Sequence, residues 1–152
     1  MPSLLVQSCS ATKNQVTKPT PAIEVYDGYF FRIIKKAMRE GKFRSDLDFC
    51  ILSAEHGILD PEDEITTYDR RMTAERAAEL CGPVSSELQS RHENSDYETI
   101  ILNLGNVYEM AVDGLSEEET VHVKSIDGDG IGFKGRQLKT LIRSDSLVEE
   151  AV

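Results

Sequence analysis

The sequence has no tryptophan and only three cysteines, Cys9, Cys50 and Cys81, among its 152 residues. An odd number of widely spaced cysteines predicts neither a disulfide framework nor a zinc site, and it favours a reducing cytoplasm. No apolar run approaches the roughly 20 residues of a membrane-spanning helix. The N-terminus lacks the basic and apolar regions of a signal peptide. We therefore expect a soluble cytoplasmic protein with no membrane partner.

Basic residues are scarce, because 17 Lys and Arg stand against 27 Asp and Glu and give a net charge of −10. This balance argues against general nucleic-acid binding, since phosphate contacts need Lys and Arg. The charge is uneven, however: residues 1–44 hold eight basic and three acidic residues. One cationic region on an acidic body is therefore compatible with the composition. The acidity also fits a salt-loving host.

Short apolar runs alternate with stretches of helical periodicity. The predicted strands are 4–6, 49–52, 99–104 and 121–123. The predicted helices are 22–40, 74–91, a short segment ending at Val112, and 133–143. Thr73 should cap the second helix, and Pro83 should kink or restart it. This alternation predicts an α/β fold: a single domain over 1–152 with a mostly parallel central sheet flanked by helices, and an acidic tail over about 144–152.

Polar turns follow three of the predicted strands: Ser8-Cys9-Ser10, Ser53-Ala54-Glu55 and Asn103-Leu104-Gly105. Because the carboxyl ends of parallel strands meet at one edge of a sheet, these turns should lie close together and form a ligand site. The first turn continues through Thr12 and Lys13, whose hydroxyl and ammonium groups suit an anion. The glycines and the Gly-Lys-Ser/Thr of a P-loop are missing.

Two further segments offer cations to a phosphate. The loop before 74–91 contains Tyr68, Asp69, Arg70 and Arg71. Arginine can hold phosphate with two hydrogen bonds and tyrosine can stack on a base, although an Asp–Arg pair that anchors the loop is the alternative. A Gly-rich turn precedes a predicted helix whose basic residues are Lys134, Arg136, Lys139 and Arg143. Such a helix N-terminus suits an anion, but a solvated basic face is the simpler interpretation.

Acid–base candidates are few. Glu55, His56 and Asp69 are the carboxylates and imidazole near the predicted strand ends, where they could exchange protons with a substrate, or simply face water. Cys9 could act as a nucleophile, but spacing ties no histidine to it. Neither metal-ligand spacing nor a cofactor motif occurs, so we predict no metal and no cofactor.

Five motifs occur in order along the chain: Ser8-Cys9-Ser10-Ala11-Thr12-Lys13; Tyr26-Asp27-Gly28-Tyr29-Phe30; Leu52-Ser53-Ala54-Glu55-His56-Gly57-Ile58-Leu59 with Tyr68-Asp69-Arg70-Arg71-Met72; Asn103-Leu104-Gly105-Asn106-Val107-Tyr108; and the basic segment Gly132 to Arg143. Together they resemble the YaaA-type peroxide-stress protein family and its shorter relatives of unknown function. His56 and Cys9 stand where that family has Tyr and Pro, and this chain is shorter. The resemblance implies an α/β fold with a positively charged cleft, a DNA-associated role in oxidative-stress protection, and no settled enzymatic activity.

The expected function is therefore to bind a nucleotide or nucleic-acid element in a polar cleft at the strand ends. The predicted ligand-binding residues are Ser8, Ser10, Thr12, Lys13, Ser53, Tyr68, Arg70, Arg71, Asn103, Tyr108 and Arg136. A hydrolase that cleaves the glycosidic bond of a nucleoside or nucleotide, using Glu55, Asp69 or His56, is one alternative. A protein-interaction domain is the other. The oligomeric state stays open.

Overall fold

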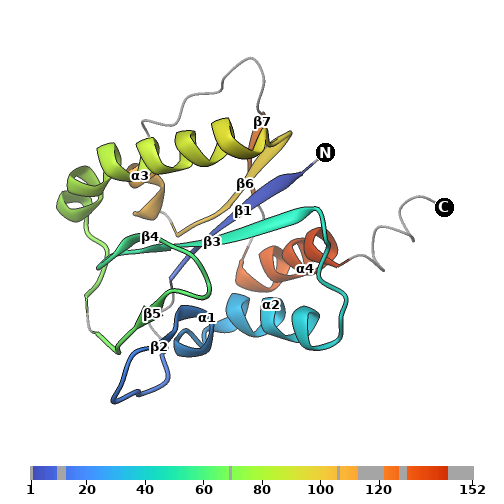
Figure 1. The fold of residues 1–152 in the computed structure, drawn as a ribbon, viewed down its shortest axis with the longest axis horizontal. Coiled ribbons are helices and arrows are strands. Elements are labelled where there is room, and N and C mark those ends of the chain that lie inside the picture. The colour runs from blue at the N-terminus through green and yellow to red at the C-terminus, as the bar shows by residue number, and fades with distance from the viewer. Residues whose placement is uncertain are drawn as a thin grey trace.

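The central sheet has five strands in the order β4-β3-β1-β6-β7 (Figure 1). The computed structural model describes residues 2–9, 13–68, 70–105, 107–112, 122–126 and 130–143. The strands are β1 (Ser3–Ser8), β3 (Leu47–Ser53), β4 (Gly57–Leu59), β6 (Thr99–Asn103) and β7 (His122–Ser125). All neighbours pair in parallel except β4, which pairs antiparallel with β3. The expected α/β class and mostly parallel sheet are confirmed.

Helices cover both faces of this sheet (Figure 1). The helix α3 (Ala74–Ser95) and the short 3₁₀ helix η1 (Tyr108–Val112) pack on the face to which Leu4 and Val6 point. The helices α1 (Ala22–Val25), α2 (Tyr29–Arg39) and α4 (Ile131–Ile142) pack on the opposite face, with Leu5. Successive side chains of a strand point to opposite faces, so β1 supplies both halves of the core.

The segment expected as one loop over 58–72 contains two short strands. Gly57, at φ +76°, allows the chain to turn back directly from β3 into β4, a backbone conformation that favours glycine. Farther on, β5 (Glu64–Ile65) pairs antiparallel with β2 (Thr20–Pro21). This small second sheet ties the segment after β4 to the segment after β1.

The expected helix over 22–40 is wrong, because the chain leaves the helical conformation at Tyr26 and resumes it at Tyr29. Tyr26 is extended (ψ 131°), and Gly28, also extended, precedes the first residue of α2. The backbone of Tyr26 instead pairs with Lys13 in an isolated antiparallel bridge. The break starts a new helix, α2, at the carboxyl edge of the sheet.

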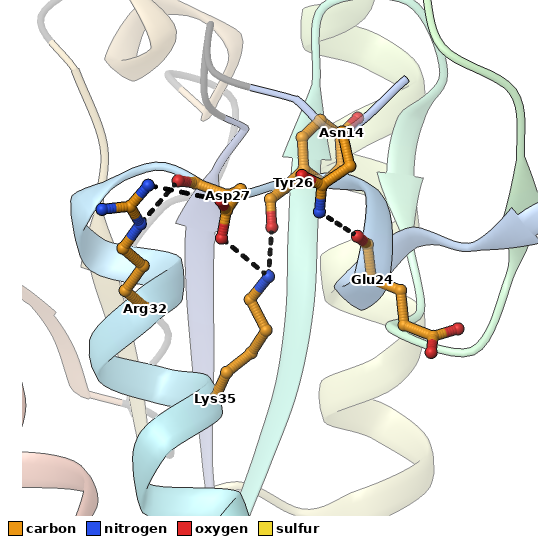
Figure 2. Close-up of polar contacts among 6 residues, drawn as sticks. All are labelled: Asn14, Glu24, Tyr26, Asp27, Arg32 and Lys35. Carbon is orange, nitrogen blue, oxygen red and sulfur yellow. Dashed lines mark hydrogen bonds and ion pairs between the residues drawn. The ribbon is translucent and has the colours of Figure 1, made fainter. Parts of the chain in front are cut away.

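Side chains of α2 stabilise this break (Figure 2). Lys35 Nζ donates to the carbonyl oxygen of Tyr26 at 2.7 Å and to Asp27 Oδ1 at 3.3 Å. Arg32 donates to the backbone and side-chain oxygens of Asp27. Asn14 Nδ2 donates to the carbonyl oxygen of Glu24 at 2.9 Å. The hydrogen bond from Lys35, followed by that from Arg32, lowers the pKa of Asp27.

Asp27→Asn should therefore destabilise the protein in a pH-dependent way. A carboxylate whose pKa is lowered in the folded state contributes stability above its unfolded pKa of about 3.9 and loses it as pH falls through the folded value. Urea unfolding should show a gap between wild type and variant that is constant from pH 7 to about 5 and closes below about pH 4. Glu24→Gln is the control, because among the described residues no ion pair involves its carboxylate. A gap of equal size at pH 3 and pH 7 would contradict this account.

The helix α3 does not restart at Pro83, one of the two outcomes expected there, but continues through it. Thr73 caps the helix by accepting from the amide of Arg76 at 3.1 Å, which confirms that prediction. Gly82 and Pro83 are both exposed, so neither contributes to the core. These two poor helix formers make the middle of α3 its weakest part.

Gly82→Ala should stabilise the protein by about 0.5–1 kcal/mol, because alanine costs less backbone entropy in a helix. A Cβ at this position would meet no heavy atom within 4 Å. Chemical denaturation measures the effect. The matched control is Gly135→Ala in α4, where the new Cβ would lie 2.4 Å from Tyr29 Oη and should destabilise. Equal losses of stability for Gly82→Ala and Gly135→Ala would contradict the placement of Gly82 on the exposed side of α3.

Candidate functional site

The strand order creates a crevice at the carboxyl ends of β1 and β6. Strand β1 pairs with β3 on one side, where Ser8 lies opposite Leu52, and with β6 on the other, where Gln7 lies opposite Asn103. From β1 the chain continues to α1 and α2 on one face, and from β6 it continues to η1 on the other. Ligands of open α/β sheets bind at such a switch point, beyond the carboxyl ends of the strands.

A pocket of about 530 Å³ fills this crevice, and we call it the strand-end pocket. It is within the usual size range of small-molecule sites. Its lining consists of Gln7–Cys9, Gly28–Phe31, Asn103–Gly105, Tyr108, Gly130 and Lys134. The pocket thus joins two strand ends to the first turns of α2 and α4.

The charge of the described lining is positive. Lys134 is its one ionisable cation, and no carboxylate or imidazole belongs to it. Both α2 and α4 begin after a glycine, Gly28 and Gly130, so no side chain at the cap position accepts from the first-turn amides. Helix N-termini carry partial positive charge and favour anions. The strand-end pocket therefore suits an anionic group on a chain that is acidic overall.

Tyr29 forms the part of the pocket wall between the two helices. Its side chain is 45% exposed, and its ring lies directly against Gly135 of α4. A Cβ at Gly135 would overlap two ring carbons and the hydroxyl oxygen of Tyr29. Glycine at this position therefore lets the first turns of α2 and α4 approach each other with an aromatic ring between them.

Two buried amide side chains form the floor. Gln7 and Asn103 are 1% and 2% exposed, and Asn103 Nδ2 donates to Gln7 Oε1 at 2.7 Å. Ser8, next to them, accepts from the amide of Gly105 at 3.4 Å. These contacts link the ends of β1 and β6 through side chains as well as through the backbone.

Cys9 and Tyr108 lie on the pocket wall, with 3.0 Å between Sγ and Oη. The amide of Cys9 donates to the carbonyl oxygen of Leu52, which extends the pairing of β1 with β3 by one residue. Burial, reinforced by the neighbouring Cys9, raises the pKa of Tyr108. Tyr108 therefore presents a neutral hydroxyl and an aromatic surface at neutral pH.

A hydroxyl cluster, made of Tyr26, Ser53 and Tyr68, lies beside the pocket. Tyr68 Oη is 2.6 Å from Tyr26 Oη and 2.7 Å from Ser53 Oγ. Burial raises the pKa of Tyr26 to about 12 and raises that of Tyr68 as well. Lys13 Nζ lies 4.6 Å from the centre of the Tyr68 ring, a cation–π contact. These groups hold together the segments that follow β1 and β3.

The structure thus separates the predicted site residues into groups. Ser8, Asn103 and Tyr108 line the strand-end pocket. Lys13, Ser53 and Tyr68 belong to the neighbouring hydroxyl cluster or contact it. The expected residues Ser10, Thr12 and Asp69 lie outside the described part of the chain.

The remaining predicted residues do not line this pocket. Glu55 pairs with Arg70 at 3.7 Å, with both side chains more than a third exposed. His56 is exposed and its ring lies perpendicular to that of Tyr68, with 5.3 Å between the ring centres, and Arg71 is exposed. Arg136 lines a separate groove of about 360 Å³ between β7 and α4.

Gln7, Gly28, Tyr29 and Lys134 are among the lining residues that the predicted ligand-binding set did not include. Gln7 had a signal, since it is a polar residue that directly follows an apolar run. Lys134 had one too, because it follows the Gly-rich turn. Gly28 had one as well, because a glycine inside a predicted helix is costly and can mark a close approach to the backbone. Tyr29 belongs to the motif Tyr26-Asp27-Gly28-Tyr29-Phe30, but its position in the helical periodicity gave no sign of a pocket.

Among the described residues, no helix is both long and apolar enough to cross a membrane. Nor do three His, Cys, Asp or Glu side chains gather there in a way that could hold a metal ion.

Comparison with known proteins yields a family and a fold. A family of unknown function, DUF6884, matches residues 4–141. The fold is similar to the crystal structure of AF0587, a protein of unknown function, with a TM-score of 0.53 and 15% identity. The match covers 93% of this chain and 44% of that chain, so this chain spans less than half of AF0587. Among curated proteins, none matches. These comparisons contain no link to YaaA-type proteins.

The three cysteines should differ in reactivity. Cys9 and Cys81 are partly exposed, whereas Cys50 is fully buried, and burial raises its pKa to about 12. Because the thiolate is the reactive form, iodoacetamide should alkylate Cys9 and Cys81 in the native protein and Cys50 only in urea. Mass spectrometry of the peptides measures each site. Equally fast modification of Cys50 in the native protein would contradict the described core.

Proposed function

The chain belongs to DUF6884, a family of unknown function, and we propose that it binds a phosphate-bearing nucleotide, free or as part of a nucleic-acid strand, in the strand-end pocket. The observation that carries this proposal is the charge of the pocket. On a chain of net charge −10, the described lining holds Lys134 and two helix N-termini and no carboxylate. Such an arrangement stabilises a phosphate group.

The rest of the lining suits the remainder of a nucleotide. Tyr29 and Tyr108 offer aromatic surfaces on which a base can stack. Gln7 and Asn103 place buried polar groups at the floor, where the edge of a base would point. In this arrangement the phosphate lies at the helix N-termini and the base lies over the strand ends.

The overall acidity favours a small ligand or a single strand over duplex DNA. Duplex binding needs many phosphate contacts from Lys and Arg, whereas the described pocket offers one lysine. The resemblance to YaaA-type proteins supports a nucleic-acid ligand and a role under oxidative stress as part of this proposal. The hydrolase alternative receives less support, because Glu55 and His56, its two candidate residues in the described part of the chain, do not line the pocket.

Thermal melting with adenosine 5′-monophosphate (AMP), adenosine and a short single-stranded oligonucleotide tests the proposal at low salt. A ligand at about 100 times its dissociation constant adds roughly 2.7 kcal/mol to the free energy of unfolding. AMP should raise the melting temperature more than adenosine does, because only AMP carries the phosphate. Lys134→Ala should weaken AMP binding about tenfold, the usual size of a lost hydrogen bond to a charged group.

Arg136→Ala is the matched control. It removes one positive charge from the same helix, two residues away, but from the separate groove beside β7. It should leave AMP binding unchanged. If neither AMP nor the oligonucleotide raises the melting temperature, the proposed function is wrong.

A further inference from the structure

The orientation of the two floor amides follows from a single backbone atom. The carbonyl oxygen of Ser8 can only accept, so the group of Gln7 that lies 3.2 Å from it must be the donor Nε2. Gln7 Oε1 then faces Asn103, which must present its own donor, Nδ2, at 2.7 Å. Neither amide can turn over without losing its hydrogen bond.

This chain of hydrogen bonds leaves Asn103 Oδ1 as an acceptor. Among the described residues none donates to it. Asn103 is 98% buried, yet its Oδ1 is not one of the fully enclosed side-chain atoms without a partner. The residue lines the strand-end pocket, so the oxygen accepts from water or from a ligand there. A ligand that displaces the water without supplying a donor would leave a buried acceptor unpaired, which is costly.

We propose that Asn103 selects the base: its Oδ1 accepts a hydrogen bond from an exocyclic amino group, so the pocket prefers a nucleotide whose base carries one (adenine, cytosine or guanine) over one with uracil or hypoxanthine. The inference rests on the proposed function and adds base specificity to it. Adenine and cytosine present an amino group where hypoxanthine and uracil present a carbonyl oxygen. A carbonyl there would face the Asn103 acceptor, and neither group would have a donor.

Ring N–H groups fit this floor less well. The ring N–H of uracil is flanked by two carbonyl oxygens, and that of hypoxanthine by one. Each carbonyl would be brought towards Asn103 Oδ1, which is itself an acceptor. An amino group projects beyond the ring and reaches the acceptor alone.

The test compares AMP with purine riboside 5′-monophosphate, which has the same ring and phosphate but hydrogen in place of the amino group. Calorimetry with the wild-type protein should show AMP binding at least about tenfold more tightly, the effect of leaving one buried acceptor unpaired. Asn103→Ala should bring the ratio of the two dissociation constants to about 1. Lys134→Ala should weaken both ligands equally and keep the wild-type ratio.

Urea unfolding of Asn103→Ala without ligand shows whether that variant folds, and the comparison of the two ligands on the wild-type protein does not depend on it. If the wild-type protein binds both ligands equally well, the specificity inference is overturned and the proposed function stands. If neither ligand binds, the proposed function fails and the inference fails with it.

Discussion

The central position of β1, paired in parallel with β3 on one side and β6 on the other, is the constraint on which the site depends. The register with β6 sets Leu5 opposite Ile101 and Gln7 opposite Asn103. Alternate residues of a strand share a face, so both pairs lie on the face covered by α2 and α4. That face is apolar in its interior and becomes polar at its carboxyl end. The strand-end pocket occupies this transition.

The positions of α2 and α4 give the strand-end pocket its positive charge. The break at Tyr26 starts α2 at Tyr29 instead of continuing a helix from Ala22, and the side chains of Lys35 and Arg32 stabilise it. Gly135 then admits the Tyr29 ring between α2 and α4. Two helix N-termini therefore reach the ends of β1 and β6. A positive pocket is built in this way on an acidic chain with few basic residues.

Strand positions could be predicted because buried strands are continuous apolar runs. Ser8 and Asn103 could be placed because they lie within two residues after such runs. The break in the helix at Tyr26 could not be predicted, because Tyr26 and Phe30 continue the helical spacing. The break depends instead on contacts of Tyr26 with Lys35 and Lys13, which the fold creates. Which of Lys134 and Arg136 lines the strand-end pocket depends on how α4 is rotated about its own axis, and the sequence alone does not give this rotation. Residues two apart on a helix point about 200° apart, so only Lys134 faces the pocket.

A titration followed by two-dimensional NMR tests the central claim most directly, that the strand-end pocket is where a nucleotide binds. AMP would be added to isotope-labelled protein while the side-chain amide signals of Gln7 and Asn103 are recorded with the backbone signals. The account predicts the largest changes at these two amides and at the first turns of α2 and α4. Changes confined to the groove beside β7, around Arg136 and Phe133, would contradict it.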